Sequence, residues 1–208
     1  DIVYIPTAGG NEKYSKDYKD FNLAVRFMTA GAKSVTILHT KEPGEANSDS
    51  FIAPLKNADA VWFSGGRQWR LVDSYKDTKT EEMFWQVLNG GGIIGGSSAG
   101  ATIQGSYLAR GDTKNNQIMM GDHEAGFSFI KNIAIDQHVI ARNRHFDMFN
   151  ILDKFEVMGE SYVIIFDGSF WSREGHGLKN LPNDNLFYFL RAGDKYDLRQ
   201  RQVIQSKD

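Results

Sequence analysis

The sequence predicts an α/β fold, specifically a three-layer α/β/α sandwich with a mostly parallel central sheet and antiparallel strands near the C-terminus. Three observations support this class. Apolar strand-like runs alternate with amphipathic helix-like segments as far as Phe166. Glycine-rich turns follow two of the expected strands directly. A chain of 208 residues with 41% hydrophobic content can form one sizeable core but is short for two, so we expect a single domain over residues 1–208.

The expected elements follow in order along the chain. Short apolar runs bounded by turn residues predict strands at residues 2–5, 35–38, 60–63, 93–95, 133–135 and 162–166. Helical spacing predicts helices at residues 18–30, 50–57, from Gln68 onward, 80–88 with Thr80 as N-cap, 99–105 and 146–157. Residues 109–128, rich in Gly, Asp and Asn, predict a long loop. Residues 170–171, 185–190 and 202–204 are expected to add short antiparallel strands.

Composition excludes several classes of function. A net charge of -2 and an isoelectric point near 6.2 give no electrostatic basis for binding nucleic acid or an anionic membrane. The absence of cysteine removes disulfides, thiolate nucleophiles and the usual structural zinc sites. We expect no cofactor and no metal. No apolar run is long enough to span a bilayer, so we expect a soluble protein, cytoplasmic or secreted after removal of a leader.

The chain begins abruptly in the strand-like residues 2–5, without a methionine or a signal peptide. We therefore expect that a leader or a first strand is missing ahead of Asp1.

One short motif carries most of the chemistry. The stretch Gly96-Ser97-Ser98-Ala99-Gly100 fits the G-x-S-x-G pattern of a nucleophile elbow, between an apolar strand and a small-residue helix. Ser98 is the candidate nucleophile. Gly65 and Gly66 follow another strand, and if the two strands are neighbours, the backbone N–H groups of Gly66 and Ala99 can form an oxyanion hole.

A serine needs a base, and five histidines are available: His39, His123, His138, His145 and His176. His138 is the strongest candidate because Asp136-Gln137-His138 directly follows an apolar strand. Arg142 and Arg144 come shortly after, and a cationic pair beside a base suits a carboxylate-bearing substrate. His123 lies in the long loop and is a candidate lid residue.

The carboxylate that orients the base is less clearly marked. Asp167 ends the strand at residues 162–166 and is the first choice, with Asp122, Glu124 and Asp136 as competitors. The order Ser98, His138, Asp167 differs from that of ordinary α/β-hydrolases, in which the acid precedes the histidine.

Taken together, several motifs resemble the cyanophycinase and aspartyl dipeptidase (peptidase E) group of serine peptidases, whose fold is like that of class I glutamine amidotransferases. The matching segments are Ile5-Pro6-Thr7-Ala8, Phe63-Ser64-Gly65-Gly66 with Gln68, Gly95 to Ala101, Asp136-Gln137-His138 with Arg142 and Arg144, and Gly193 to Leu198. The cluster around His138 is more similar to cyanophycinase than to the dipeptidase branch.

The resemblance implies roles for individual residues. Ser98 would be the nucleophile and His138 the base, and the substrate pocket would contain Gln68, Asp136, Gln137, Arg142 and Arg144. One departure is visible: the cyanophycinase pattern has an Asp-Glu-x-Thr-Ala run near the third triad position, where this chain has Phe166-Asp167-Gly168-Ser169-Phe170. Asp167 would then replace a glutamate and reach one methylene less far.

The sequence thus favours a serine peptidase that cleaves aspartyl-linked peptide or isopeptide bonds, with β-Asp-Arg substrates first. Three alternatives stay open: an aspartyl dipeptidase, a small-molecule amidase or esterase that shares the elbow, and a catalytically impaired binding domain of the same fold. An amidotransferase is disfavoured because those enzymes use a cysteine. The expected partner is a peptide substrate, and a homodimer stays open.

Overall fold

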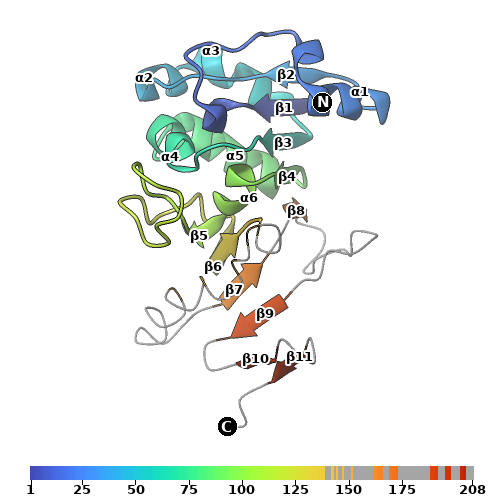
Figure 1. The fold of residues 1–208 in the computed structure, drawn as a ribbon. Coiled ribbons are helices and arrows are strands. Elements are labelled where there is room, and N and C mark those ends of the chain that lie inside the picture. Colours follow the sequence, from blue (N-terminus) through green and yellow to red (C-terminus); the bar gives the residue numbers. More distant parts are fainter. Residues whose placement is uncertain are drawn as a thin grey trace. The chain divides into compact units, whose positions relative to one another are not determined.

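The structure is a computed structural model that describes residues 1–138, 142, 144, 147, 151, 162–165, 169–172, 188–191, 195–197 and 202–204. From residue 162 onward it describes the backbone of the strands only. The chain divides into two compact units (Figure 1). Unit 1 comprises Asp1–Ala101 and Gly168–Asn180, and unit 2 comprises Thr102–Asp167 and Leu181–Asp208. Each unit has its own sheet.

Unit 1 contains a five-stranded sheet in the order β2-β1-β3-β4-β8. Its strands are β1 (Ile2–Ile5), β2 (Val35–Ile37), β3 (Ala60–Phe63), β4 (Ile93–Gly96) and β8 (Ser169–Ser172). The first four are parallel to one another, and β8 pairs antiparallel with β4. This confirms the predicted parallel α/β class. The pairing of β3 with β4 also meets the condition set above for an oxyanion hole between Gly66 and Ala99. The carboxyl ends of β1, β3 and β4 consequently meet at one edge of the sheet.

Helices pack on both faces of this sheet, as is usual for a mostly parallel sheet. On one face, α1 (Asn22–Thr29) packs over Tyr4, Val35 and Ile37, and Phe27 meets Trp62 edge-on with ring centroids 5.4 Å apart. On the other face, Phe63 meets Phe84 of α5 (Lys79–Asn89) at 5.0 Å.

The remaining helices of unit 1 are short. They are α2 (Pro43–Ala46), α3 (Asp49–Ile52), α4 (Trp69–Tyr75) and the 3-10 segments η1 (Thr7–Gly9), η2 (Tyr18–Asp20) and η3 (Ala53–Asn57). The short helix α6 (Ala99–Thr102) begins in unit 1, and its last residue is the first of unit 2. The predicted N-cap of α5 is wrong: Thr78, not Thr80, accepts the hydrogen bond from the Glu81 N–H. Thr80 is instead buried and donates to the Ala46 carbonyl at 2.6 Å.

Unit 2 contains a four-stranded sheet in the order β5-β6-β7-β9 and a separate two-stranded pair, β10-β11. The strands are β5 (Gly105–Tyr107), β6 (Ile130–Asp136), β7 (Tyr162–Ile165), β9 (Tyr188–Arg191), β10 (Lys195–Asp197) and β11 (Gln202–Ile204). The strands β5, β6 and β7 are parallel. The expected helix over residues 99–105 is shorter than predicted, because Gly105 already starts β5, where a Cβ would come within 2.6 Å of the Ile133 carbonyl oxygen. The helix expected at residues 146–157 lies largely outside the described residues.

Candidate active site

Ser98 occupies a tight turn between β4 and α6. Its φ is +54°, in the left-handed region that side chains rarely adopt. Such a conformation costs about 1–3 kcal/mol and persists only where the surroundings enforce it. Here the Ser97 N–H donates to the Phe63 carbonyl at 3.1 Å, and the Ala101 N–H donates to the Ser98 carbonyl at 3.0 Å. This is the strained strand-to-helix serine that the elbow motif predicts.

Two glycines of the motif are required by close packing. A Cβ on Gly96 would lie 2.1 Å from the Gly100 carbonyl oxygen, and a Cβ on Gly100 would lie 2.1 Å from the Phe63 carbonyl oxygen. Real Cβ atoms essentially never approach closer than 3.0 Å. The start of α6 can therefore sit directly on β3 and β4 only because both positions lack a side chain.

The turn after β3 lies beside Ser98. A Cβ built on Gly65 would be 3.2 Å from the Ser98 Cβ and 3.7 Å from its Oγ. Gly66 has a φ of +146°, and a Cβ there would come within 2.0 Å of the Ala8 carbonyl oxygen.

Gln68 lies at the start of α4, two residues after Gly66. Its side chain is buried, with 1% exposed, and its carbonyl accepts from the Leu71 N–H at 3.0 Å. The preceding residue, Arg67, fixes the turn by donating its backbone N–H to the Ala8 carbonyl at 2.8 Å. The structure thus gathers Ser98, Gly66, Ala99 and Gln68 at the carboxyl edge of the unit 1 sheet.

In unit 2, Asp136 ends β6 and is completely buried. Its carboxylate forms a bidentate ion pair with Arg110, from Nε to Oδ1 at 2.7 Å and from Nη2 to Oδ2 at 2.9 Å. The same Oδ1 accepts from the Gln137 N–H at 2.8 Å. The Asp136 carboxylate is therefore engaged inside unit 2 rather than exposed to a ligand.

His138 follows two residues later and is half-buried. Its φ is +56°, so it too is held in a left-handed conformation. The Arg142 N–H donates to the His138 carbonyl at 3.0 Å, which closes a turn around the histidine, and the Arg142 side chain is exposed. A half-buried histidine on a restrained turn suits a proton-transfer role.

Arg144 is buried, with 2% exposed. It donates from Nη1 to the Gln137 carbonyl and from Nη2 to Oε1 of Gln117, both at 3.3 Å. Within the described part of the chain, the Arg144 Nε and the Gln137 Oε1 are buried without a hydrogen-bond partner. Burial and the neighbouring charge of Arg110 lower the pKa of Arg144 from its usual value.

The other titratable candidates have local partners. The His39 Nδ1 lies 2.8 Å from Oγ1 of Thr7 in unit 1, and burial lowers the pKa of His39. In the long loop, the His123 Nδ1 lies 2.9 Å from Oδ1 of Asp122. The competing acid Glu124 accepts from the Tyr107 hydroxyl at 3.1 Å. Asp167, His145 and His176 lie outside the described residues.

Sequence reasoning missed three residues that hold the unit 2 cluster together: Arg110, Gln117 and Asp147. Asp147 bonds to Arg110 at 2.6 Å, and Gln117 bonds to Arg144. Arg110 and Gln117 lie in the loop at residues 109–128, whose polar and glycine-rich composition predicts only a connecting segment. Only the length of that loop signalled a functional role.

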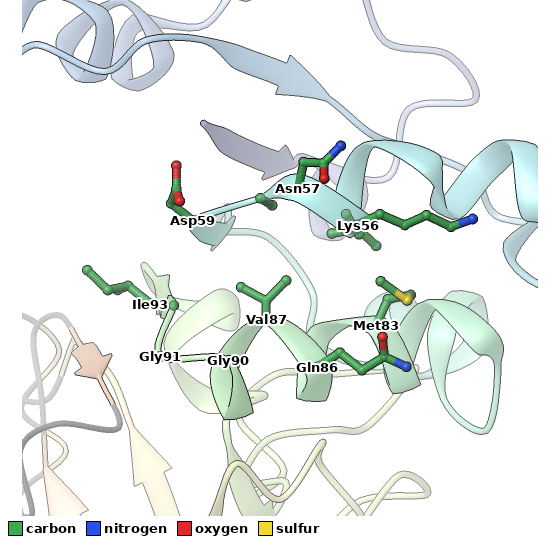
Figure 2. A pocket seen from close by; sticks show the side chains of 12 residues that line it. Lys56, Asn57, Asp59, Met83, Gln86, Val87, Gly90, Gly91 and Ile93 are labelled. Carbon is green, nitrogen blue, oxygen red and sulfur yellow. The ribbon is translucent and has the colours of Figure 1, made fainter.

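A groove of about 600 Å³ lies at the amino-terminal ends of β3 and β4, whereas Ser98 follows the carboxyl end of β4. Figure 2 shows Lys56, Asn57 and Asp59 on one side and Val87, Gln86 and Met83 of α5 on the other. The residues that line this groove include no serine and no histidine.

The part of the chain that the structure describes holds no group of three side chains suited to a metal ion. Among the same residues, none of the helices has the length and apolar character to cross a membrane.

A serine on a strained strand-to-helix turn of a parallel α/β sheet is the arrangement of serine hydrolases. The profile of peptidase family S51 matches residues 1–178, and the chain belongs to this family. As a member of this family, the chain is a hydrolase of the peptidase class.

Similar proteins agree with this assignment. The chain is 29% identical over 210 residues to a cyanophycinase from Trichormus variabilis, covering 86% of this chain and 70% of that protein. It is 25% identical over 211 residues to a cyanophycinase from Geminocystis herdmanii, covering 86% and 76%. The crystal structure of a peptidase from an acI-B1 Actinobacterium superposes with a TM-score of 0.61 at 22% identity, covering 89% of this chain and 80% of that one. That last likeness supports the α/β fold.

Proposed function

We propose that the protein is a serine peptidase that hydrolyses aspartyl-linked peptide or isopeptide bonds through an acyl-enzyme. Ser98 attacks the aspartyl carbonyl, and His138 takes its proton and returns it to the leaving amine. Asp167 orients His138. The observation that carries the proposal is the φ of +54° at Ser98, because a serine held at such a cost in a glycine-packed turn is typical of a nucleophile.

The N–H groups of Gly66 and Ala99 bind the oxyanion of the tetrahedral intermediate. Support comes from the pairing of β3 with β4, which brings the two turns to adjacent strand ends. The turn after β3 also lies beside Ser98, since a Cβ built on Gly65 would be 3.2 Å from the Ser98 Cβ. Both amides belong to backbone that close packing fixes, so they need no reorganisation as charge develops.

For the substrate, we propose an aspartyl group joined to arginine through its β-carboxyl, as in cyanophycin. The motif around His138 and the cyanophycinases among the relatives support this choice. Arg142, which is exposed, and Arg144 supply cations for a substrate carboxylate, and Gln68 and Gln137 supply amides. Asp136 contributes through its buried pair with Arg110, by shaping the strand end, rather than by direct substrate contact.

The proposal is tested by incubating the purified chain with cyanophycin and with an α-aspartyl dipeptide, beside Ser98→Ala. Serine-dependent release of β-Asp-Arg supports the cyanophycinase reading. Cleavage of the α-aspartyl substrate alone indicates a dipeptidase. Turnover of simple esters that needs neither Arg142 nor Arg144 indicates an esterase or amidase, and inactivity on all substrates indicates the impaired binding domain.

The proposal also covers the domain organisation, the C-terminal strands and the oligomeric state. We propose that residues 1–208 act as one domain, that C-terminal antiparallel strands complete a three-layer sandwich, and that the protein forms a homodimer. Sedimentation velocity tests the dimer directly, since a single monomeric species would contradict it.

A further inference from the structure

Arg110 is the largest fully buried side chain among the described residues. One guanidinium joins three segments of unit 2. It forms the bidentate pair with Asp136 at the end of β6, bonds to Oδ2 of Asp147 at 2.6 Å, and reaches the Asn116 carbonyl in the long loop at 3.4 Å. A planar guanidinium is the side chain suited to such simultaneous contacts.

The backbone of Arg110 is fixed as firmly as its side chain. Its φ is +59°, and its N–H donates to the Met119 carbonyl at 2.9 Å. The adjacent Gly111 lies so close to the opposite side of the loop that a Cβ would come within 2.1 Å of the His123 carbonyl oxygen. Arg110 is therefore a rigid anchor rather than a side chain that fills space.

The contacts of Arg110 lead directly to His138. Oδ1 of Asp136 accepts from both the Arg110 Nε and the Gln137 N–H, so the ion pair sets the backbone direction of Gln137. His138 is the next residue and has its own restrained φ of +56°. A shift of Asp136 therefore moves the histidine.

A second consequence concerns Arg144. Without Arg110, the buried carboxylate of Asp136 lacks its cation, and an unpaired buried charge is strongly unfavourable. Arg144 is a second cation of this cluster, and the charges of Arg110 and Asp136 both act on it. It would be drawn from its bonds to the Gln137 carbonyl and to Gln117.

We propose that Arg110 is a positioning residue, which through Asp136 fixes the turn that carries His138 and leaves Arg144 in place for substrate. This inference rests on the proposed function for its kinetic consequences. Arg110 itself is fully buried, so it acts through Asp136 and touches no substrate.

If the pair of Arg110 and Asp136 only stabilised the fold, replacing both residues would leave activity intact. A double variant therefore distinguishes a structural role from a positioning role. Replacing both partners of a buried pair with apolar side chains often leaves stability unchanged or higher. Arg110→Met alone should lower the melting temperature, and Arg110→Met combined with Asp136→Leu should restore much of it. The positioning role predicts that the double variant still has a kcat at least about 100-fold below wild type, as a displacement near 1 Å produces.

The matched control is Lys131→Met, the same change of cation to thioether at an exposed position of β6, which should retain wild-type kcat and KM. Arg110→Lys keeps the charge but loses the bidentate geometry. It should fold and still lose much of its kcat, which keeps the test informative if the double variant does not fold.

Histidine ring NMR spectra of the whole chain give a readout that needs no substrate. The His138 resonances should shift in Arg110→Lys and in the double variant, while those of His39 in unit 1 should not. A kcat within about threefold of wild type in the folded double variant, or unchanged His138 resonances in both, would overturn the inference. Wild-type inactivity on all substrates would refute the proposed function alone, since the spectra still test Arg110.

Discussion

The packing of Gly100 against β3 makes a sharp prediction about the elbow. In Gly100→Ala the new Cβ would lie 2.1 Å from the Phe63 carbonyl oxygen and 2.6 Å from the Phe63 carbonyl carbon. Both are backbone atoms of a central strand, so no side-chain rotation relieves the contact. The start of α6 must therefore move by more than about 1 Å to reach an ordinary separation.

The magnitude follows from that displacement. Misplacing a catalytic group by 1 Å can cost about 100-fold in rate, and overpacking of this kind costs about 1–3 kcal/mol. We expect kcat/KM on the best aspartyl substrate to fall about 100-fold and the melting temperature to fall by about 4–8 °C for a loss near 2 kcal/mol. The assays are initial rates and thermal unfolding followed by circular dichroism.

The control is Gly44→Ala in α2, where a Cβ meets nothing within 4 Å. An alanine in a helix is favoured over glycine by up to about 1 kcal/mol, so this variant should be as active as wild type and no less stable. Wild-type kcat/KM and melting temperature in Gly100→Ala would refute the packing argument for the elbow.

Three further predictions use the same kind of reasoning. Tyr75→Phe removes a buried hydroxyl that lies 2.6 Å from Oγ1 of Thr7 and accepts from the Thr40 N–H. It should lower the free energy of unfolding in urea by about 1–3 kcal/mol, and an unchanged value would show that these two hydrogen bonds do not stabilise the fold. Burial lowers the pKa of His39, so the neutral imidazole stabilises the fold above pH about 6.5 and this stabilisation is lost on acidification. His39→Gln should therefore lose less unfolding free energy than wild type between pH 7 and 5, and an equal loss in the two proteins would contradict this. Arg142→Ala should lower kcat/KM about 10- to 100-fold for aspartyl substrates but not for simple esters, whereas Arg26→Ala on α1 should change neither; equal activity of both variants on aspartyl substrates would exclude the pocket role.

Much of the framework could be predicted from the sequence. The strands β1, β3 and β4 follow from apolar runs that end at glycine or proline, and their parallel pairing follows from the helices between them. The elbow was predictable too, because a glycine-rich turn around a serine has a local geometric cause. The structure adds the positive φ of Ser98, which the pattern implied but could not measure.

The errors have physical reasons. Thr80 and Thr78 are equally good N-cap residues by type, and only the buried bond of Thr80 to the Ala46 carbonyl decides between them. The loop around Arg110 reads as a polar connection, yet its arginine is buried by a pairing with Asp136, 26 residues along the chain. Composition and periodicity are local, so a buried ion pair between distant residues leaves no local pattern.

Covalent labelling decides whether Ser98 is an activated nucleophile. The native chain is treated with a fluorophosphonate probe, digested, and mapped by mass spectrometry, with Ser98→Ala as the matched control. We expect a single stoichiometric adduct on the peptide that contains Ser98, and no labelling of the variant. An adduct on another serine, or equal labelling of both proteins, would contradict it.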